Sequence, residues 1–143
     1  MFMNKIQALA NEMKQFFSPQ TVTNVYSICK QLEIEIVEAP IQADAYLECE
    51  NGNSYIVLKE SLNSNRKKFT IAHELGHFYI PWHSELMFGC DIKEMDFKND
   101  YAPREKEANL FAAELLMPMK EFKNHFSGKI CYTTVSELAN IFD

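Results

Sequence analysis

The chain has 143 residues, which fits a single domain over residues 1–143 and leaves little room for a second. Hydrophobic residues make up 47% and charged residues 24% of it, as in ordinary packed globular proteins. The formal net charge of −6 argues against nonspecific binding to nucleic acid, and the low count of four Gly and five Pro argues against a disordered or linker-rich chain.

The N-terminal region predicts two amphipathic helices. Apolar residues recur at helical spacing over residues 6–17, and Ser18-Pro19 would end this helix. A second run with the same spacing covers residues 22–32, with Thr21 as a suitable N-cap.

Three strands are predicted next, two of them as a hairpin. Apolar residues alternate from residue 34 to about residue 38, and Pro40 closes the segment. The stretch that follows, AYLECENGNSYIVLKES, contains two β-rich runs on either side of Asn51-Gly52, a dipeptide typical of a two-residue hairpin turn.

A long helix is predicted through KKFTIAHELGHFYI, with an N-cap among residues 63–65 and Pro81 at its end. Residues 82–102 show no clear period, and loops of this length are usually functional or mobile. The aromatic residues of this segment either close over a cleft or fill the core, and both interpretations stay open.

The C-terminal part predicts further helices. Pro103 suits the first turn of a helix that continues through REKEANLFAAELLM to residue 117. A short helical segment through residue 126 and a last helix over residues 134–142 follow. We therefore expect an α+β fold in which a small sheet with one hairpin packs against several helices.

The motif His73-Glu74-Leu75-Gly76-His77 lies in the long predicted helix and indicates a metal site. Residues four apart share a helix face, so the imidazoles of His73 and His77 can bind one Zn²⁺. Glu74 projects beside that face, where it can deprotonate a zinc-bound water. The alternative is a buried structural His pair, but two His and a Glu are costly to bury unpaired, and a metal ion satisfies all three.

Such a site needs a third protein ligand, and the sequence offers His83 and Glu105. His83 has the spacing of the third histidine of metzincins, but that class has Gly where this chain has Ile80. On a wheel of about 100° per residue, Glu105 is central to an inward-facing stripe of small residues. A carboxylate on a buried stripe requires a cation, so we favour Glu105.

Polar residues near these ligands carry weaker signals. Asn109, one turn beyond Glu105 on the same face, either hydrogen-bonds a ligand imidazole or is satisfied by backbone or water. We expect His83 to lie on a surface loop, and the alternative is that it stays near the site as a substrate or oxyanion contact. Glu107 and Glu114 fall on the opposite helix face and are interpreted as solvated charges.

Gly76 is the only glycine inside a predicted helix, where it costs about 1 kcal/mol relative to Ala. It lies close to His73 on the helical wheel. We therefore expect it to leave room for the helix that carries Glu105.

Neither the cysteines nor the N-terminus indicates secretion. The four cysteines are widely spaced and form no CxxC pair, so neither a disulfide framework nor a thiolate zinc site is expected. The N-terminal segment lacks the continuous apolar core of a signal peptide, and no stretch approaches transmembrane length. We expect a reduced, cytoplasmic protein that does not bind a membrane.

The blocks KKFTIAHELGHF and EKEANLFAAELLMP, with NSYIVLKESL before them, resemble the ImmA/IrrE family of zinc metallopeptidases over about residues 20–142. The resemblance implies a minimal zincin-like domain in which His73, His77 and Glu105 bind zinc and Glu74 is the catalytic residue. Members of this family are commonly encoded by phages, mobile elements and bacterial stress systems, and several cleave a helix-turn-helix repressor.

We therefore expect a zinc-dependent endopeptidase of the gluzincin type that cleaves a specific cytoplasmic protein, such as a helix-turn-helix transcriptional repressor. Glu74 would take the proton of the zinc-bound water and deliver it to the leaving amine. The substrate would lie extended along an edge strand of the hairpin sheet. The alternative is a non-hydrolytic zinc-binding sensor, toxin component or repressor-binding module with the same fold. The complete ligand set weighs against this alternative, whereas the small size of a 143-residue chain, with little surface for substrate specificity, weighs for it. No direct nucleic-acid binding is expected.

Overall fold

The computed structural model describes residues 2–86 and 101–125. Its elements in chain order are α1 (Phe2–Phe17), α2 (Val25–Gln31), β1 (Ile34–Ala39), β2 (Ala45–Glu50), β3 (Asn53–Lys59), α3 (Ser64–Tyr79), the 3₁₀ helix η1 (Pro81–Leu86), α4 (Tyr101–Leu116) and α5 (Met119–His125). The fold is α+β, as predicted, and is consistent with a minimal zincin-like domain. The predicted last helix and most of the predicted 82–102 loop lie outside the described residues.

The three strands form one mixed sheet in the order β1-β3-β2. β2 and β3 pair as the predicted antiparallel hairpin, whereas β1 pairs with β3 in parallel. Asn51 and Gly52 have φ angles of 51° and 81°, the left-handed conformations that a type I′ turn requires at both central positions. The central strand is the most buried, and β2 is left at one edge of the sheet.

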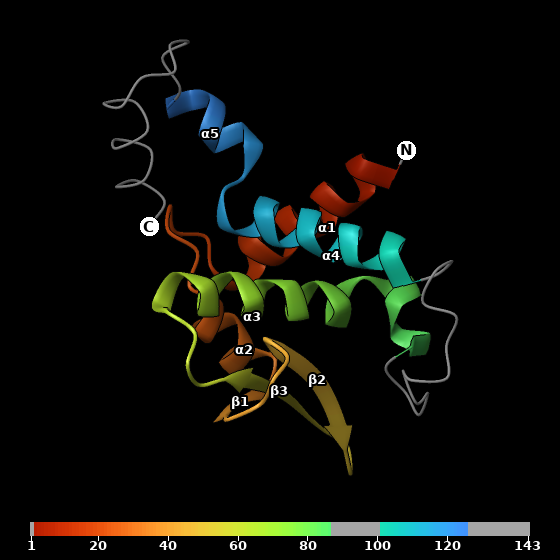
Figure 1. Cartoon of the computed structure of the whole chain (residues 1–143). Coiled ribbons are helices and arrows are strands. Elements are labelled where there is room, and N and C mark those ends of the chain that lie inside the picture. The colour runs from red at the N-terminus through yellow and green to blue at the C-terminus, as the bar shows by residue number, and fades with distance from the viewer. Residues whose placement is uncertain (1, 87–100, 126–143) are drawn as a thin grey trace.

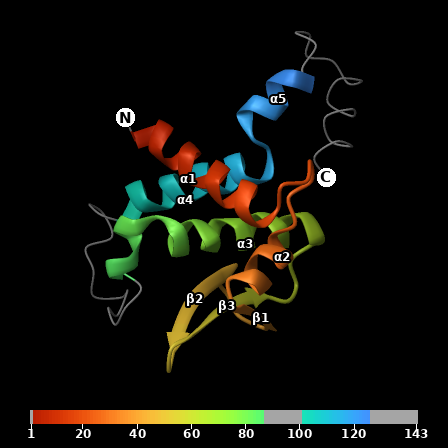
Figure 2. The ribbon, with the colours of Figure 1, turned by 180° about the vertical axis from the view of Figure 1, so that it is seen from behind.

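The helices lie in layers on one side of the sheet (Figures 1 and 2). α3 crosses above the strands together with α2, and α4 and α1 lie beyond α3. α3 is therefore covered by the sheet on one side and by α4 on the other, which explains why its sequence is apolar on several faces. Its side chains Ile71, Ala72 and Leu75 are fully buried in the core.

α4 packs directly against α3 at Gly76. A Cβ atom added there would lie 3.2 Å from the Cβ of Phe111 and 3.3 Å from the Cα of Ala108. The small residues Ala108 and Ala112 are fully buried on the facing side of α4. The expected room for the Glu105 helix is thus present, and it sets the spacing between the two helices.

The segment between α1 and α2 differs from the prediction. The N-cap of α2 is Asn24, whose side chain accepts a hydrogen bond of 3.0 Å from the amide of Ser27, and the predicted cap Thr21 is wrong. The reason is a buried lysine. Lys14 Nζ donates to the carbonyl of Gln20 at 2.5 Å and to Thr23 Oγ1 at 2.8 Å, which holds this segment against α1 and delays the helix.

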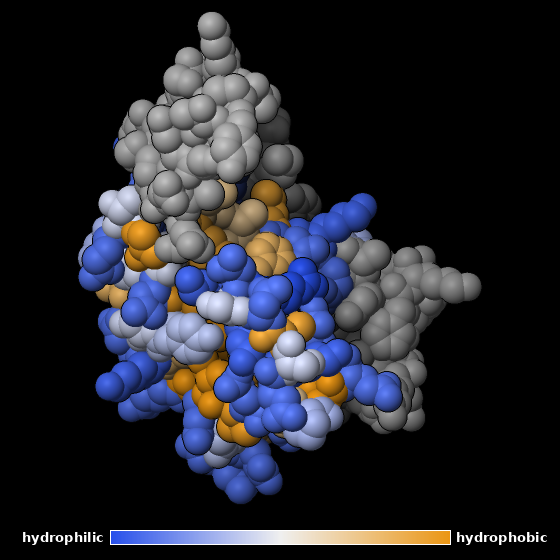
Figure 3. Space-filling model, turned by 60° about the vertical axis from the view of Figure 1, so that its left-hand side comes forward, coloured by the Kyte–Doolittle hydropathy of each residue, from blue (hydrophilic) through white to orange (hydrophobic). Residues whose placement is uncertain are grey.

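Hydrophilic side chains predominate on the face shown in Figure 3, with hydrophobic ones in patches between them. Among the described residues, no helix combines the length and the apolar character needed to cross a membrane.

Candidate metal centre

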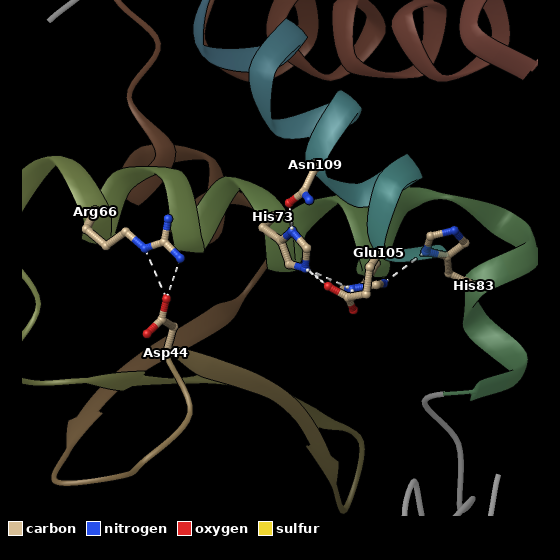
Figure 4. Close-up of polar contacts among 7 residues, drawn as sticks. Asp44, Arg66, His73, His83, Glu105 and Asn109 are labelled. Carbon is tan, nitrogen blue, oxygen red and sulfur yellow. Dashed lines mark hydrogen bonds and ion pairs between the residues drawn. The ribbon is translucent and has the colours of Figure 1, made fainter. Parts of the chain in front are cut away.

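Three predicted ligands from two helices meet between α3 and α4 (Figure 4). His73 and His77 lie one turn apart on α3, and Glu105 reaches them from the beginning of α4. The Nε2 atoms of the two histidines are 3.1 Å apart. The Glu105 oxygens lie 2.9 Å from His73 Nε2 and 3.0 Å from His77 Nε2.

This arrangement suits a metal ion. One ligand atom from each of the three side chains lies within 4.8 Å of the others. Ligands about 2.0–2.1 Å from a tetrahedral zinc ion are separated from each other by roughly 3.3 Å, close to the distances in this cluster. Two imidazoles and one carboxylate are also the donor types that zinc takes in hydrolytic enzymes, where a fourth position stays open.

The charges in the cluster also favour a bound cation. Burial raises the pKa of Glu105, but the two histidines beside its carboxylate outweigh burial and hold its pKa far below the usual value. Burial lowers the pKa of His73, but the Glu105 carboxylate outweighs burial and the pKa is raised. The Glu105 carboxylate is therefore ionised. Its negative charge favours a cation between this carboxylate and the Nε2 atoms of His73 and His77.

Glu74 lies next to the cluster and is 7% exposed. Burial raises its pKa, although the nearby His77 and His73 act in the opposite direction. Its carboxyl is therefore more basic than a solvated glutamate, as a group that accepts and returns a proton near neutral pH must be.

A cleft of about 390 Å³ opens over His73, Glu74 and Glu105. One wall is the segment that leads into the edge strand β2, and the floor is one face of α3. The ion pair between Asp44 and Arg66, with an oxygen–nitrogen distance of 2.6 Å, joins this wall to α3 (Figure 4). The lining residues are Ala43, Asp44, Ala45, Arg66, Phe69, Thr70, His73, Glu74, Glu105 and Asn109.

Asn109 contacts the first histidine of the motif. Its Oδ1 lies 2.8 Å from His73 Nδ1, which matches one of the two predicted roles for this residue. Asn Oδ1 accepts only, so His73 Nδ1 carries the proton and donates it. The lone pair of neutral His73 is then on Nε2, toward Glu105.

His83 is not the surface residue that the sequence suggested. It is 1% exposed, and its Nδ1 lies 2.9 Å from Nδ1 of His77, on the side of that ring away from the three ligand atoms. Burial and the neighbouring His77 lower the pKa of His83 to about 4. The described residues thus group Glu105, and not His83, with the two motif histidines.

Glu107 and Glu114, which we expected in solvent, also make contacts with other segments of the chain. Glu107 accepts a hydrogen bond of 2.7 Å from Trp82 Nε1 and lies 3.5 Å from His83 Nε2. Glu114 is 6% exposed and accepts from the amide of Met119, at the start of α5. The wheel of α4 missed both contacts because η1 and α5 fold back onto the face that looked free. In the sequence, the contacts of Glu107 are indicated only by Trp82 and His83, two side chains with N–H donors that directly follow Pro81.

Comparison with known proteins gives one family match and two relatives. Residues 29–143 match the model of the IrrE N-terminal-like domain, a peptidase family. The chain is 30% identical over 108 residues to uncharacterized immunity region protein 2 of Bacillus phage phi105, covering 71% of this chain and 65% of that protein. It is 26% identical over 115 residues to metallopeptidase ImmA of Bacillus subtilis (strain 168), covering 80% of this chain and 66% of that protein. The chain thus spans about two thirds of the length of these relatives.

Proposed function

The chain belongs to the peptidase family of the IrrE N-terminal-like domain, and from this premise we propose that it is a zinc-dependent endopeptidase of the gluzincin type. His73, His77 and Glu105 are the proposed zinc ligands, and Glu74 is the proposed catalytic residue. The observation that carries the proposal is the meeting of three ligand atoms beside a buried glutamate, at the floor of a cleft next to an edge strand.

The side chains alone do not provide a Lewis acid for peptide hydrolysis, and the proposed zinc ion would provide it. When bound, zinc supplies the positive charge that polarises the scissile carbonyl and lowers the pKa of the attacking water. Glu74 accepts the proton of that water and returns it to the nitrogen of the departing amine. Asn109 keeps the His73 ring oriented through its hydrogen bond to Nδ1.

The cleft supports an extended peptide as substrate. β2 lies at the edge of the sheet, and its first residue, Ala45, lines the cleft together with Ala43 and Asp44 before it, so we expect the main chain of β2 to pair with a substrate segment. Counting along α3, Arg66 is seven residues before His73, which is roughly 10 Å of helix or about three residues of extended peptide. The substrate segment would therefore contact Arg66 and Asp44 about three residues from the cleaved bond.

The substrate is proposed to be a specific cytoplasmic protein, such as a helix-turn-helix transcriptional repressor. The resemblance to the ImmA/IrrE family supports this class, and one relative carries the name of a phage immunity region protein.

The test compares the zinc-loaded full chain with Glu74→Gln, which keeps the size of the side chain and removes its basicity. Both proteins are assayed for zinc content and for cleavage of a proteome-derived peptide library and of the repressor encoded beside this chain. We expect one zinc per chain in both proteins, and cleavage that is roughly 10²- to 10⁴-fold slower in Glu74→Gln.

Cleavage at the normal rate in Glu74→Gln would contradict the assigned role of this residue. One zinc per chain without cleavage of any probe would favour the alternative of a non-hydrolytic sensor or repressor-binding module. Absence of zinc binding would remove the proposal altogether.

A further inference from the structure

His77 makes a contact that the ligand set does not explain. His83 is carried into the interior by η1, where its backbone amide donates to the carbonyl of Ile80 at 3.0 Å. The centroids of the His77 and His83 rings are 5.0 Å apart, and their Nδ1 atoms are separated by 2.9 Å. Two nitrogens at this distance must share one hydrogen, so one ring donates and the other accepts.

The ligand geometry decides which ring donates. His77 Nε2 faces His73 Nε2 and Glu105 Oε1, so it must hold a lone pair when it binds a metal. The proton of neutral His77 is then on Nδ1, and His83 Nδ1 is its acceptor. Neutral His83 must consequently carry its own proton on Nε2.

The proton on His83 Nε2 faces Glu107. Among the described residues, His83 Nε2 has no hydrogen-bond partner, and the closest carboxylate oxygen is Glu107 Oε1 at 3.5 Å. The other oxygen of Glu107 accepts from the indole of Trp82 at 2.7 Å, which fixes the position of the carboxylate. A small shift of either side chain completes a chain of donors that runs from His77 through His83 to Glu107.

We propose that His83 and Glu107 are positioning residues that hold His77 in the tautomer with a free Nε2 lone pair. The inference rests on the proposed function, because it assigns these residues to the same metal site. The hydrogen bond between the Nδ1 atoms then joins His77 and His83 into one pair. Glu105 lies at the outer nitrogen of this pair on His77, and Glu107 lies at the outer nitrogen on His83. Outer partners of this kind typically contribute 10- to 100-fold to metal affinity.

The test measures zinc affinity by competition with a chromophoric chelator in the full chain. Glu107→Gln and His83→Phe are each expected to weaken zinc binding roughly 10- to 100-fold. His83→Gln should restore most of the affinity, because its carbonyl oxygen accepts from His77 Nδ1 without needing Glu107. In the His83→Gln background, Glu107→Gln should therefore have no further effect.

Tyr79→Phe is the matched control. Tyr79 is two residues from His77 on α3, and its hydroxyl donates to Glu12 at 2.8 Å, away from the ligand cluster. Loss of that hydrogen bond should leave zinc affinity unchanged. Proton NMR of the zinc-loaded proteins adds a readout that general damage to the fold would not give. The Nδ1 proton of His77 should exchange slowly in the parent protein and in His83→Gln, and rapidly in His83→Phe.

The outcomes separate this inference from the proposed function. If the parent chain binds no zinc, the proposed function fails. If it binds one zinc, and Glu107→Gln and His83→Phe bind it equally tightly, only the positioning role is overturned. An undiminished effect of Glu107→Gln in the His83→Gln background would also overturn it. Should His83→Phe fail to fold, Glu107→Gln and the His83→Gln pair still decide the question.

Discussion

Two polar clusters, one buried and one half-buried, lie near opposite ends of α4, and they differ in their balance of donors and acceptors. Near its C-terminal end, Lys14 donates to Gln20 and Thr23, and Thr23 Oγ1 in turn donates to the carbonyl of Leu115 at 2.6 Å. Near its N-terminal end, Glu105 faces the Nε2 atoms of His73 and His77.

The difference lies in where the cation comes from. In the first cluster, which we call the lysine cluster, the ammonium group is part of the chain and oxygen acceptors surround it. In the second, the ligand cluster, lone pairs converge and the described side chains provide no permanent positive charge among them. A buried polar group that is satisfied by the chain itself stabilises the fold, whereas converging acceptors indicate an ion from solution.

Zinc should therefore stabilise the protein through the ligand cluster, and this is the largest expected effect. At free zinc a thousand times above Kd, linkage predicts an increase of about 4 kcal/mol in the free energy of unfolding. Glu105→Ala should lose this increase, whereas His83→Ala should still bind one zinc per chain at saturating metal. Thermal unfolding with and without zinc measures both, and the reverse pattern would restore His83 as the third ligand.

Removal of the internal cation should act on stability alone. Lys14→Met leaves buried carbonyl oxygens without a donor and should lower the free energy of unfolding by about 2–3 kcal/mol, as measured in urea. Zinc affinity should be unchanged. Lys5→Met, at an exposed position of the same helix, serves as the control and should change stability by less than about 0.5 kcal/mol. A loss of zinc affinity in Lys14→Met would show that the two clusters are not separate.

Gly76→Ala should affect the ligand cluster more than stability. The gain in helix propensity of about 1 kcal/mol partly offsets the tight contacts with Phe111 and Ala108. Since α4 must move by a few tenths of an ångström, Glu105 moves with it, and zinc affinity should fall roughly three- to tenfold. Gly52→Ala is the opposite case: it strains a left-handed turn and should lower stability while leaving zinc affinity unchanged.

The smallest effect is expected for the exposed pair at the cleft. Asp44 and Arg66 are 38% and 55% exposed, so Arg66→Gln should change the free energy of unfolding by less than about 1 kcal/mol and leave zinc affinity unchanged. A larger change in urea unfolding would mean that this pair stabilises the fold as the lysine cluster does.

The features predictable from sequence were those set by neighbours along the chain. The Asn51-Gly52 dipeptide indicated the hairpin, and the four-residue spacing of His73 and His77 placed both rings on one face of α3. The stripe of small residues on α4 indicated that Glu105 points inward. Each of these signals lies within one helix or one turn.

The missed features depend on contacts between distant segments. Nothing local distinguishes the cap at Asn24 from Thr21, because the segment is set by Lys14 on the preceding helix. The burial of His83 and the contact of Glu107 require η1 to fold against α4. A helical wheel shows which face of a single helix is apolar. It does not show whether another segment of the chain covers the polar face.

The placement of the ligands on two helices affects how long the folded state lasts. His77 and Glu105 are 28 residues apart, and they meet only when α4 has docked over Gly76. In an unfolded chain the two motif histidines lose their common helix face, so the three ligand atoms meet only when α3 has formed and α4 has packed against it. We expect this step to follow the folding transition state. Interactions completed after the folding transition state slow unfolding and leave the folding rate almost unchanged. The metal ion would thus extend the lifetime of the native protein, and its effect would appear in the unfolding rate.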